Sequence, residues 1–331
     1  MVWKKLNAAV SYWDKSSLYS KKSNMMALSV DKSTLNKSTK WGVAREVYKR
    51  KGNVDISGFL DKSKLILVKS SDLLNWEKVK DLKIKGIKKV IEILLDKDKF
   101  LMGLEDPDVW IDEKEIKHVY FTIAIKYKHK KGCKLYLGHA QGPSLKNLIS
   151  TKPVISNNKE IAISPLKNKD YQYVLAESWQ SNPEEGISLL KAKDMDKNWK
   201  FIKLVFNPKK HSHPWCAGYA SPCKILNQKI IKVNNNLFLG ICTGNSGEYF
   251  KRSIKYRGDF KPGLFLFNPK TGEIPWVSPE PLLEDPESKG ITFASDFISL
   301  NNHQGILYAH VNDSFVRAYK INLDELQKLL P

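Results

Sequence analysis

Short strand-like segments dominate this sequence, and long amphipathic helices are nearly absent. Runs of five to seven aromatic and branched residues, mostly bounded by Gly, Pro, Asn or Asp, occur at residues 64–69, 119–125, 134–138, 171–176, 237–242 and 263–267. Helical spacing is convincing only at residues 87–95 and 322–330. Many short strands joined by turns predict an all-β sandwich, barrel or propeller.

A weak internal repeat favours the propeller. A polar turn that ends in Trp or Leu follows a strand-like segment near residues 70, 141, 193, 268 and 322. Five such units in 331 residues leave about 66 residues for each blade, which is enough for four strands and their loops. Such turns also arise by chance in β proteins, but their order favours a five-bladed β-propeller with short peripheral helices. Without a linker or low-complexity segment, we expect residues 1–331 to form one domain.

The net charge of +20 raises the question of nucleic-acid binding. The 55 basic residues comprise 50 lysines and only five arginines, and the lysines are spread along the chain, often beside acidic residues. Proteins that read grooves usually concentrate arginine, whose planar fork suits bases and phosphates. We therefore interpret the charge as solvated lysine surface and expect no nucleic-acid partner.

Other compositional features point to a soluble cytoplasmic protein. No apolar run approaches the roughly 18 residues of a membrane span, and no signal-peptide pattern opens the sequence. The four cysteines form no CxxC pair, so we expect free, buried thiols. The sequence does not specify an oligomeric state.

The segment Leu104-Glu105-Asp106-Pro107-Asp108 holds three carboxylates in four residues. Pro107 is expected to push Asp106 toward an extended backbone and limit the directions of its side chain. At the mouth of a propeller channel, burial and neighbouring like charges would raise the pKa of Asp106, as a general acid requires. The alternative is a charged turn that caps local N–H groups.

Several segments together resemble glycoside hydrolase family 130, the β-mannoside phosphorylases and mannosidases. Glu105-Asp106-Pro107 resembles the start of the family's Glu-Asp-Pro-Arg segment. Residues 216–225, 256–282 and 307–315 resemble later family segments in the same order, and Ser278-Pro279-Glu280-Pro281 is the most specific match. The resemblance runs from about residue 60 to 328 and implies the family's propeller.

The resemblance also implies roles for individual residues. The family's acid falls on Asp106, and its sugar-binding aspartate falls on Asp313. Arg45 is similar in position to a sugar-binding arginine, and Glu105 is assigned to substrate binding with it. Trp179 is a candidate for stacking on a sugar face, although core packing is the commoner role of such aromatics.

The departures from the family concern phosphate. The phosphorylases use several arginines and a histidine, yet no arginine occurs between Arg50 and Arg252, and Glu177 stands where the family has an arginine. A carboxylate would repel a dianion, so phosphorolysis is disfavoured. An inverting hydrolase instead needs a second carboxylate to activate water. Glu177 is our first candidate and Glu248 our second, while simple pairing with a lysine is the alternative for Glu177.

We therefore expect an inverting glycoside hydrolase that acts on β-mannoside-type oligosaccharides without a metal or organic cofactor. His211 and His213 could share one face of a strand, but no third metal ligand lies near them in sequence. A catalytically inactive propeller that binds glycan or protein is one alternative. A glycosidase of another five-bladed family, of the arabinanase or fructosidase type, is the other.

Overall fold

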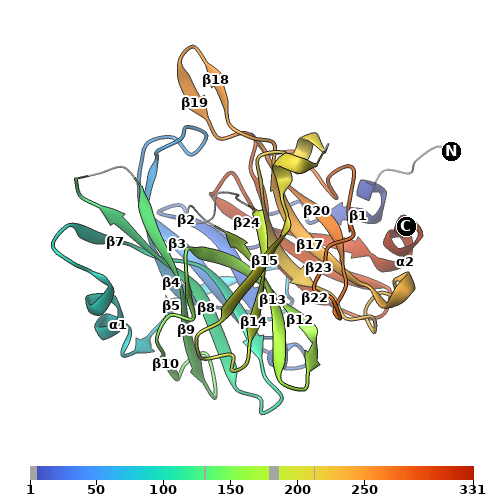
Figure 1. Cartoon of the computed structure of the whole chain (residues 1–331), viewed down its shortest axis with the longest axis horizontal. Coiled ribbons are helices and arrows are strands. Elements are labelled where there is room, and N and C mark those ends of the chain that lie inside the picture. The colour runs from blue at the N-terminus through green and yellow to red at the C-terminus, as the bar shows by residue number, and fades with distance from the viewer. Residues whose placement is uncertain (1–5, 130–131, 179–185, 212) are drawn as a thin grey trace.

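The computed structural model describes residues 6–129, 132–178, 186–211 and 213–331, and it is almost entirely β-structure (Figure 1). The two α-helices within these ranges are α1 (Ile87–Leu94) and α2 (Leu323–Lys328), close to the two helical segments expected from the sequence. Asn322 caps α2 by accepting a hydrogen bond from the backbone N–H of Glu325. Five of the six expected strand segments lie entirely in strands, and the sixth begins one residue before β17, so the all-β class is confirmed.

The strands fall into antiparallel groups of sequential neighbours. The first group consists of β2 (Asn24–Val30), β3 (Lys40–Lys51), β4 (Leu60–Ser70) and β5 (Glu77–Asp81). The second consists of β7 (Lys99–Ile111), β8 (Lys117–Tyr127), β9 (Cys133–Gly142) and β10 (Leu148–Ser150), with the short strands β6 (Ile84–Lys85) and β11 (Ile155–Ser156) beside it. One parallel residue pair, Ser63 with Gly103, joins these two groups into a single ten-stranded sheet.

Two further groups follow along the chain. The third consists of β12 (Asn158–Asn168), β13 (Tyr171–Ser178), β14 (Gly186–Ala192) and β15 (Lys200–Phe206). The fourth consists of β16 (Tyr219–Ile225), β17 (Phe238–Asn245), β20 (Phe260–Phe267) and β21 (Trp276–Val277). A separate hairpin of β18 (Tyr249–Lys251) and β19 (Ile254–Tyr256) projects from the rest of the chain (Figure 1).

The last group combines the two ends of the chain. It consists of β22 (Thr292–Ser299), β23 (Gln304–Val311) and β24 (Phe315–Asn322), and its outer strand is the N-terminal β1 (Val10–Tyr12). Val10 pairs with Ile321 and Tyr12 with Tyr319, so β1 covers the edge of β24. Short 3₁₀ turns occupy η1 (Leu6–Ala9), η2 (Lys32–Thr34), η3 (Pro208–Lys210), η4 (Pro214–Cys216) and η5 (Asn234–Asn236).

The repeated turns seen in the sequence take equivalent positions in the groups. Those near residues 70, 141, 193 and 268 each follow the third strand of a group and lead to its fourth. The turn near residue 322 follows β24 and leads to α2, because the fourth strand of that group comes from the N-terminus. Trp76 and Trp199, which end two of these turns, are buried in the core.

The first strands of the groups lie next to one another and position the site. β2 contacts β7, β7 contacts β12, β12 contacts β16, β16 contacts β22, and β22 contacts β2 again. The hydrophobic core lies between neighbouring groups: one cluster joins β4 and β23 through residues such as Ile66 and Tyr308, and another joins β13 and β20 through Leu175 and Phe265. Packing between groups therefore leaves the polar residues of the first strands facing a common centre.

Candidate functional site

Each of the five first strands carries a β-bulge, and all five bulges line one cavity. The strand register shifts within β2, β7, β12, β16 and β22, and the extra residues that line the cavity are Ala27, Asp106, Glu160, Cys223 and Ser295. A bulge redirects a side chain that a regular strand would turn to one face of the sheet. The cavity volume is about 10 Å³, roughly the space that one water needs.

Asp106 lies inside β7 rather than in a turn before a strand. Its backbone φ is +47°, in the left-handed region, and not in the extended conformation that Pro107 led us to expect. The bulge between Glu105 and Asp108 explains the difference, because it places two residues of β7 opposite one residue of the regular strand β8. Positive φ is uncommon for a residue with a side chain, so surrounding contacts must hold Asp106 in place.

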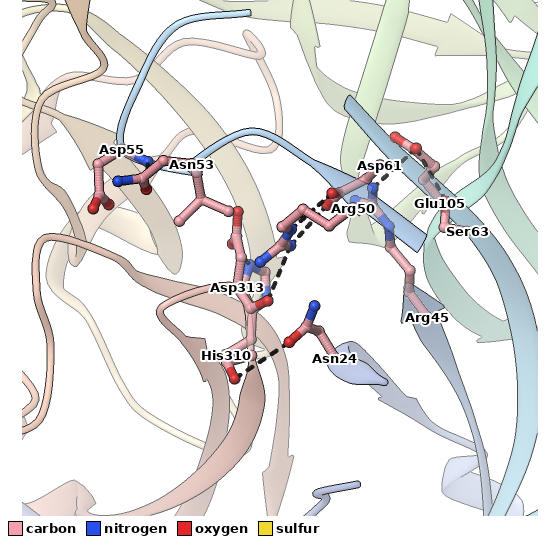
Figure 2. A network of polar contacts seen from close by, with 12 residues as sticks. Asn24, Arg45, Arg50, Asn53, Asp55, Asp61, Ser63, Glu105, His310 and Asp313 are labelled. Atoms are coloured by element: carbon pink, nitrogen blue, oxygen red, sulfur yellow. Dashed lines mark hydrogen bonds and ion pairs between the residues drawn. The ribbon is translucent and has the colours of Figure 1, made fainter. Parts of the chain in front are cut away.

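Arg45 of β3 holds the two neighbouring acids. Its Nη1 donates to Oδ1 of Asp106 over 2.9 Å, and its Nη2 lies 2.9 Å from Oε1 of Glu105. Ser63 also donates to Oε1 of Glu105 over 3.1 Å (Figure 2). The sequence placed Arg45 and Glu105 with Asp106, and the structure brings all three together.

The electrostatics of Asp106 differ from our expectation. Burial alone would raise its pKa, but the charges of Arg45, Lys159 and His310 outweigh burial, so the pKa of Asp106 lies below its usual value. Burial raises the pKa of neighbouring Glu105 despite the opposing charge of Arg45. Asp106 is therefore held as a carboxylate, and the expected raised pKa of Asp106 is wrong because Arg45 pairs with it directly.

Glu177 is the penultimate residue of β13 and is 1% exposed. Its Oε1 lies 3.3 Å from Nζ of Lys159, and its Oε2 accepts a hydrogen bond from the hydroxyl of Ser221. Burial raises the pKa of Glu177, while Lys159 and Ser221 oppose the rise. The charge of Asp106 also acts on Glu177, so the two carboxylates belong to one electrostatic cluster.

Asp313 lies at the tight turn between β23 and β24, with a φ of +49°. Its Oδ1 is 3.2 Å from Nε2 of His310, and its Oδ2 is 3.7 Å from Nη1 of Arg257. Burial would raise the pKa of Asp313, but these partners lower it far below the usual value. Arg50 binds the backbone carbonyl of Asp313 and forms a two-pronged pair with Asp61 (Figure 2).

Glu248, the second candidate for the base, does not join this cluster. Glu248 is exposed beside the projecting hairpin, and its Oε2 lies 2.5 Å from Nζ of Lys255. Trp179 lies outside the described residues. His211 packs on Phe206, with ring centroids 4.4 Å apart, and its ring centroid is 6.3 Å from that of His213. Among the described residues, no group of three or more His, Cys, Asp or Glu side chains could hold a metal ion.

Sequence reasoning missed four charged residues of the first strands. Lys159 and Glu160 lie in β12, Lys224 in β16 and Asp296 in β22. Nζ of Lys224 pairs with Asp108 and lies 3.3 Å from Oδ1 of Asp296, which also binds Lys32 over 2.9 Å. Charged residues in four of the five first strands, all except β2, were the available signal, but recognising it required the strand register.

The fold is shared with solved carbohydrate-active proteins. A structure of β-1,2-mannobiose phosphorylase from Listeria innocua, solved with β-1,2-mannobiose, matches with a TM-score of 0.69 and 13% identity over 97% of this chain and 99% of that one. The chain has a glycoside hydrolase family 130-like fold. This fold is the one implied by the Glu105-Asp106-Pro107 segment.

Two more structures with a glycoside hydrolase family 130-like fold illustrate its range. A mannose phosphorylase from Leishmania mexicana, solved with phosphate, has a TM-score of 0.61 and 14% identity, covering 98% of this chain and 92% of that one. A structure from Parabacteroides distasonis that was assigned to the glycoside hydrolases has a TM-score of 0.66 and 14% identity, covering 93% of this chain and 89% of that one. No protein-family model matches the sequence, and no curated protein matches it.

The helices α1 and α2 are both short. Within the described ranges, no helix is long and apolar enough to cross a membrane. Cys216, Cys223 and Cys242 are free and buried, as the sequence suggested, whereas Cys133 is half-buried.

Proposed function

We propose that this chain is a carbohydrate-active enzyme, an inverting glycoside hydrolase of β-mannoside-type oligosaccharides, built on one five-bladed β-propeller. Five groups of strands, with a bulge in every first strand, support the five-bladed architecture. The carboxyl cluster around Asp106 delivers a proton to the leaving oxygen. Glu177 activates water, and Asp313 with Arg45 orients sugar hydroxyl groups.

The observation that carries the hydrolase proposal is the pairing of the cations at the site. Arg45 pairs with Glu105 and Asp106, and Lys159 pairs with Glu177. Arg50 likewise pairs with Asp61, and Arg257 lies beside Asp313. A phosphate dianion would need positive charge that carboxylates have not already neutralised, and it would be repelled by the buried anion of Glu177. A water molecule is uncharged, so it needs no unpaired cation and is not repelled by Glu177.

β-1,2-Mannobiose is the first substrate to test, because the Listeria innocua phosphorylase was solved with that disaccharide. We expect release of free mannose at the same rate with and without inorganic phosphate, and the first-formed anomer, followed by proton NMR, should be inverted. A phosphate-dependent rate with formation of a mannosyl phosphate would contradict the hydrolase proposal and favour a phosphorylase.

A catalytically inactive sugar-binding propeller is the second candidate. The tight ion pair between Arg45 and Asp106 favours it, because that pair removes the proton that Asp106 would need as an acid. Calorimetric binding of β-1,2-mannobiose without turnover in any of a set of β-mannosides would support this candidate. Turnover that is lost in Glu177→Gln would exclude it.

A further inference from the structure

The acid of the proposed reaction needs a proton, and Asp106 is held as a carboxylate. Its neighbour Glu160 is the extra residue of the bulge in β12, between Lys159, which pairs with Glu177, and Ile161, which pairs with Ala176. The backbone φ of Glu160 is +43°, close to the +47° of Asp106. Both residues line the same small cavity, so two bulges on neighbouring first strands direct two carboxyl groups toward one point.

We propose that Glu160 and Asp106 share one hydrogen-bonded proton, which resides on Glu160, and that Glu160 is the catalytic residue that protonates the leaving oxygen. This inference rests on the proposed glycosidase function. Two carboxyl groups at one small site cannot both ionise without strong repulsion, so one of them keeps a proton. Arg45 binds Asp106 over 2.9 Å and so decides which group is ionised.

The charged surroundings of Glu160 agree with this assignment. Burial is the largest influence and raises the pKa of Glu160, and the charges of Asp106 and Glu177 raise it further. Lys159 opposes them without reversing the rise. A hydrogen bond between the Glu160 carboxyl and Asp106 also favours the protonated form of Glu160. Asp106 thus acts as the ionised partner that accepts this bond.

The proposed step balances in atoms and electrons. The O–H bond of Glu160 breaks as the glycosidic C–O bond breaks, and the electron pair of that C–O bond stays on the leaving oxygen, which takes the proton. A water molecule attacks the anomeric carbon and loses its proton to Glu177. The net reaction adds one water across the glycosidic bond, and proton exchange with solvent restores Glu160 and Glu177.

Leaving-group dependence provides the kinetic test. Glu160→Gln keeps the size of the side chain and a donor for Asp106, but it cannot release a proton. We expect its kcat/KM for β-1,2-mannobiose to fall by about 10²–10⁴-fold, whereas dinitrophenyl β-mannoside, whose leaving group needs no proton, should be cleaved within about tenfold of the wild-type rate. The matched control Glu273→Gln, at an exposed residue paired with Lys203, should change neither rate.

Asp106→Asn distinguishes the two possible donors. Under this proposal it should lower the alkaline limit of the pH–rate profile, because Glu160 loses its anionic neighbour and gives up its proton at lower pH. If Asp106→Asn rather than Glu160→Gln showed the leaving-group dependence, Asp106 would be the acid and the proposal would be overturned. Wild-type activity of Glu160→Gln on β-1,2-mannobiose would overturn it as well.

Carbon-13 NMR of labelled glutamate side chains locates the proton without any turnover. The Glu160 resonance, assigned by its absence in Glu160→Gln, should remain in its protonated position at pH 6, and Asp106→Asn should lower its titration midpoint by at least about one pH unit. An ionised Glu160 at pH 6 would refute the shared proton. If the wild type cleaves no β-mannoside, the proposed function fails, while this titration still decides where the proton lies.

Discussion

Arg45 donates a hydrogen bond from Nη1 to Oδ1 of Asp106 over 2.9 Å, although 61 positions separate the two residues in the sequence. The bond joins the second strand of the first group to the first strand of the second group. It pairs the buried carboxylate of Asp106 with a cation, so the exchangeable proton of the cavity is expected on a neighbouring carboxyl group, which we propose is that of Glu160. The chemistry of the site therefore depends on contact between groups and not on the Glu105-Asp106-Pro107 segment alone.

Replacement of Arg45 should destabilise the protein in a pH-dependent manner. Arg45→Met leaves Glu105 and Asp106 buried without their cation, so we expect the free energy of unfolding at pH 7 to fall by about 3–5 kcal/mol. In the wild type the pKa of Asp106 is depressed, so its stabilising contribution is present above the unfolded pKa and is lost as the pH falls through the folded pKa. In Arg45→Met the pKa of Asp106 should rise instead, so the difference between the variant and the wild type should shrink toward pH 4.

Urea unfolding at pH 7 and pH 4 measures this effect. Arg252→Met is the control, because Arg252 is exposed, and it should change stability by less than about 0.5 kcal/mol. An equal loss for Arg45→Met at both pH values would show that lost packing, rather than unpaired charge, causes the destabilisation.

Glu177 should be required for every substrate if it activates water. Glu177→Gln is expected to lower kcat/KM by about 10²–10⁴-fold on both β-1,2-mannobiose and dinitrophenyl β-mannoside, because both reactions need a deprotonated water. This pattern differs from the leaving-group dependence expected for Glu160→Gln. A loss confined to β-1,2-mannobiose would assign Glu177 to proton delivery instead.

Ser221 should tune the pH at which Glu177 works. Its hydroxyl donates to Glu177 and lowers the pKa of that carboxyl, so Ser221→Ala should raise the pKa of Glu177. A base must be ionised, so the acidic limb of the pH–rate profile should move to higher pH. Ser188→Ala removes another buried hydroxyl, one bonded to Ser178, and should leave that limb in place.

Two buried histidines should make the protein sensitive to acid. Nδ1 of His118 and Nε2 of His139 are 3.0 Å apart, and Nδ1 of His139 lies 2.9 Å from the hydroxyl of Thr151. Burial, helped by His118, lowers the pKa of His139 to about 3. Because the folded pKa of His139 lies below the unfolded value, its contribution is present above the unfolded pKa and is lost as the pH falls toward the folded pKa.

Between pH 6 and pH 4, this single group should cost about 2 kcal/mol of stability. Chemical unfolding of His139→Gln across that range should show a correspondingly shallower pH dependence. His303→Gln removes an exposed histidine that pairs with Asp324, and it should leave the slope nearly unchanged. If the free energy of unfolding of His139→Gln depended on pH as steeply as that of the wild type, groups other than His139 would cause the loss of stability in acid.

Arg317 should stabilise the group that unites both ends of the chain. Its side chain is 1% exposed, its Nε lies 2.8 Å from Oδ2 of Asp285, and its Nη1 donates to the carbonyl of Trp13 over 3.1 Å. Tyr319 also donates to Oδ2 of Asp285 over 2.6 Å. We expect losses of about 3–5 kcal/mol for Arg317→Met and about 1.5–3 kcal/mol for Tyr319→Phe.

Thermal and urea unfolding of both variants test this expectation. Lys320→Met is the neighbouring control, because Lys320 is exposed and its side chain leaves the opposite face of β24. If Arg317→Met were no less stable than Lys320→Met, the ion pair of Arg317 with Asp285 would make no net contribution to the free energy of unfolding. Some buried ion pairs behave in this way when apolar residues replace them.

Local patterns in the sequence were sufficient for the elements and for part of the site. Alternation and turn residues located strands such as β8 and β13, and the recurring turns that end at Trp76 and Trp199 fall at equivalent positions in their groups. The order of the family-like segments singled out Asp106 and Asp313, and the structure places both among buried, charged partners. The strands, the turns and the family-like segments depend on residues close together in the chain, so a sequence pattern can predict them.

The tertiary structure decided which charges meet. Glu160 and Asp106 come from the first strands of two successive groups, and only the bulges of β12 and β7 direct both into one cavity. Arg45 arrives from another group, and its charge reverses the pKa shift that burial of Asp106 would cause. The sequence by itself determined an all-β chain and singled out Asp106, Glu177 and Asp313 as candidate site carboxylates. The protonation state of each carboxylate follows from burial and from the distance to its partners, and both are set by packing between groups rather than by neighbouring residues.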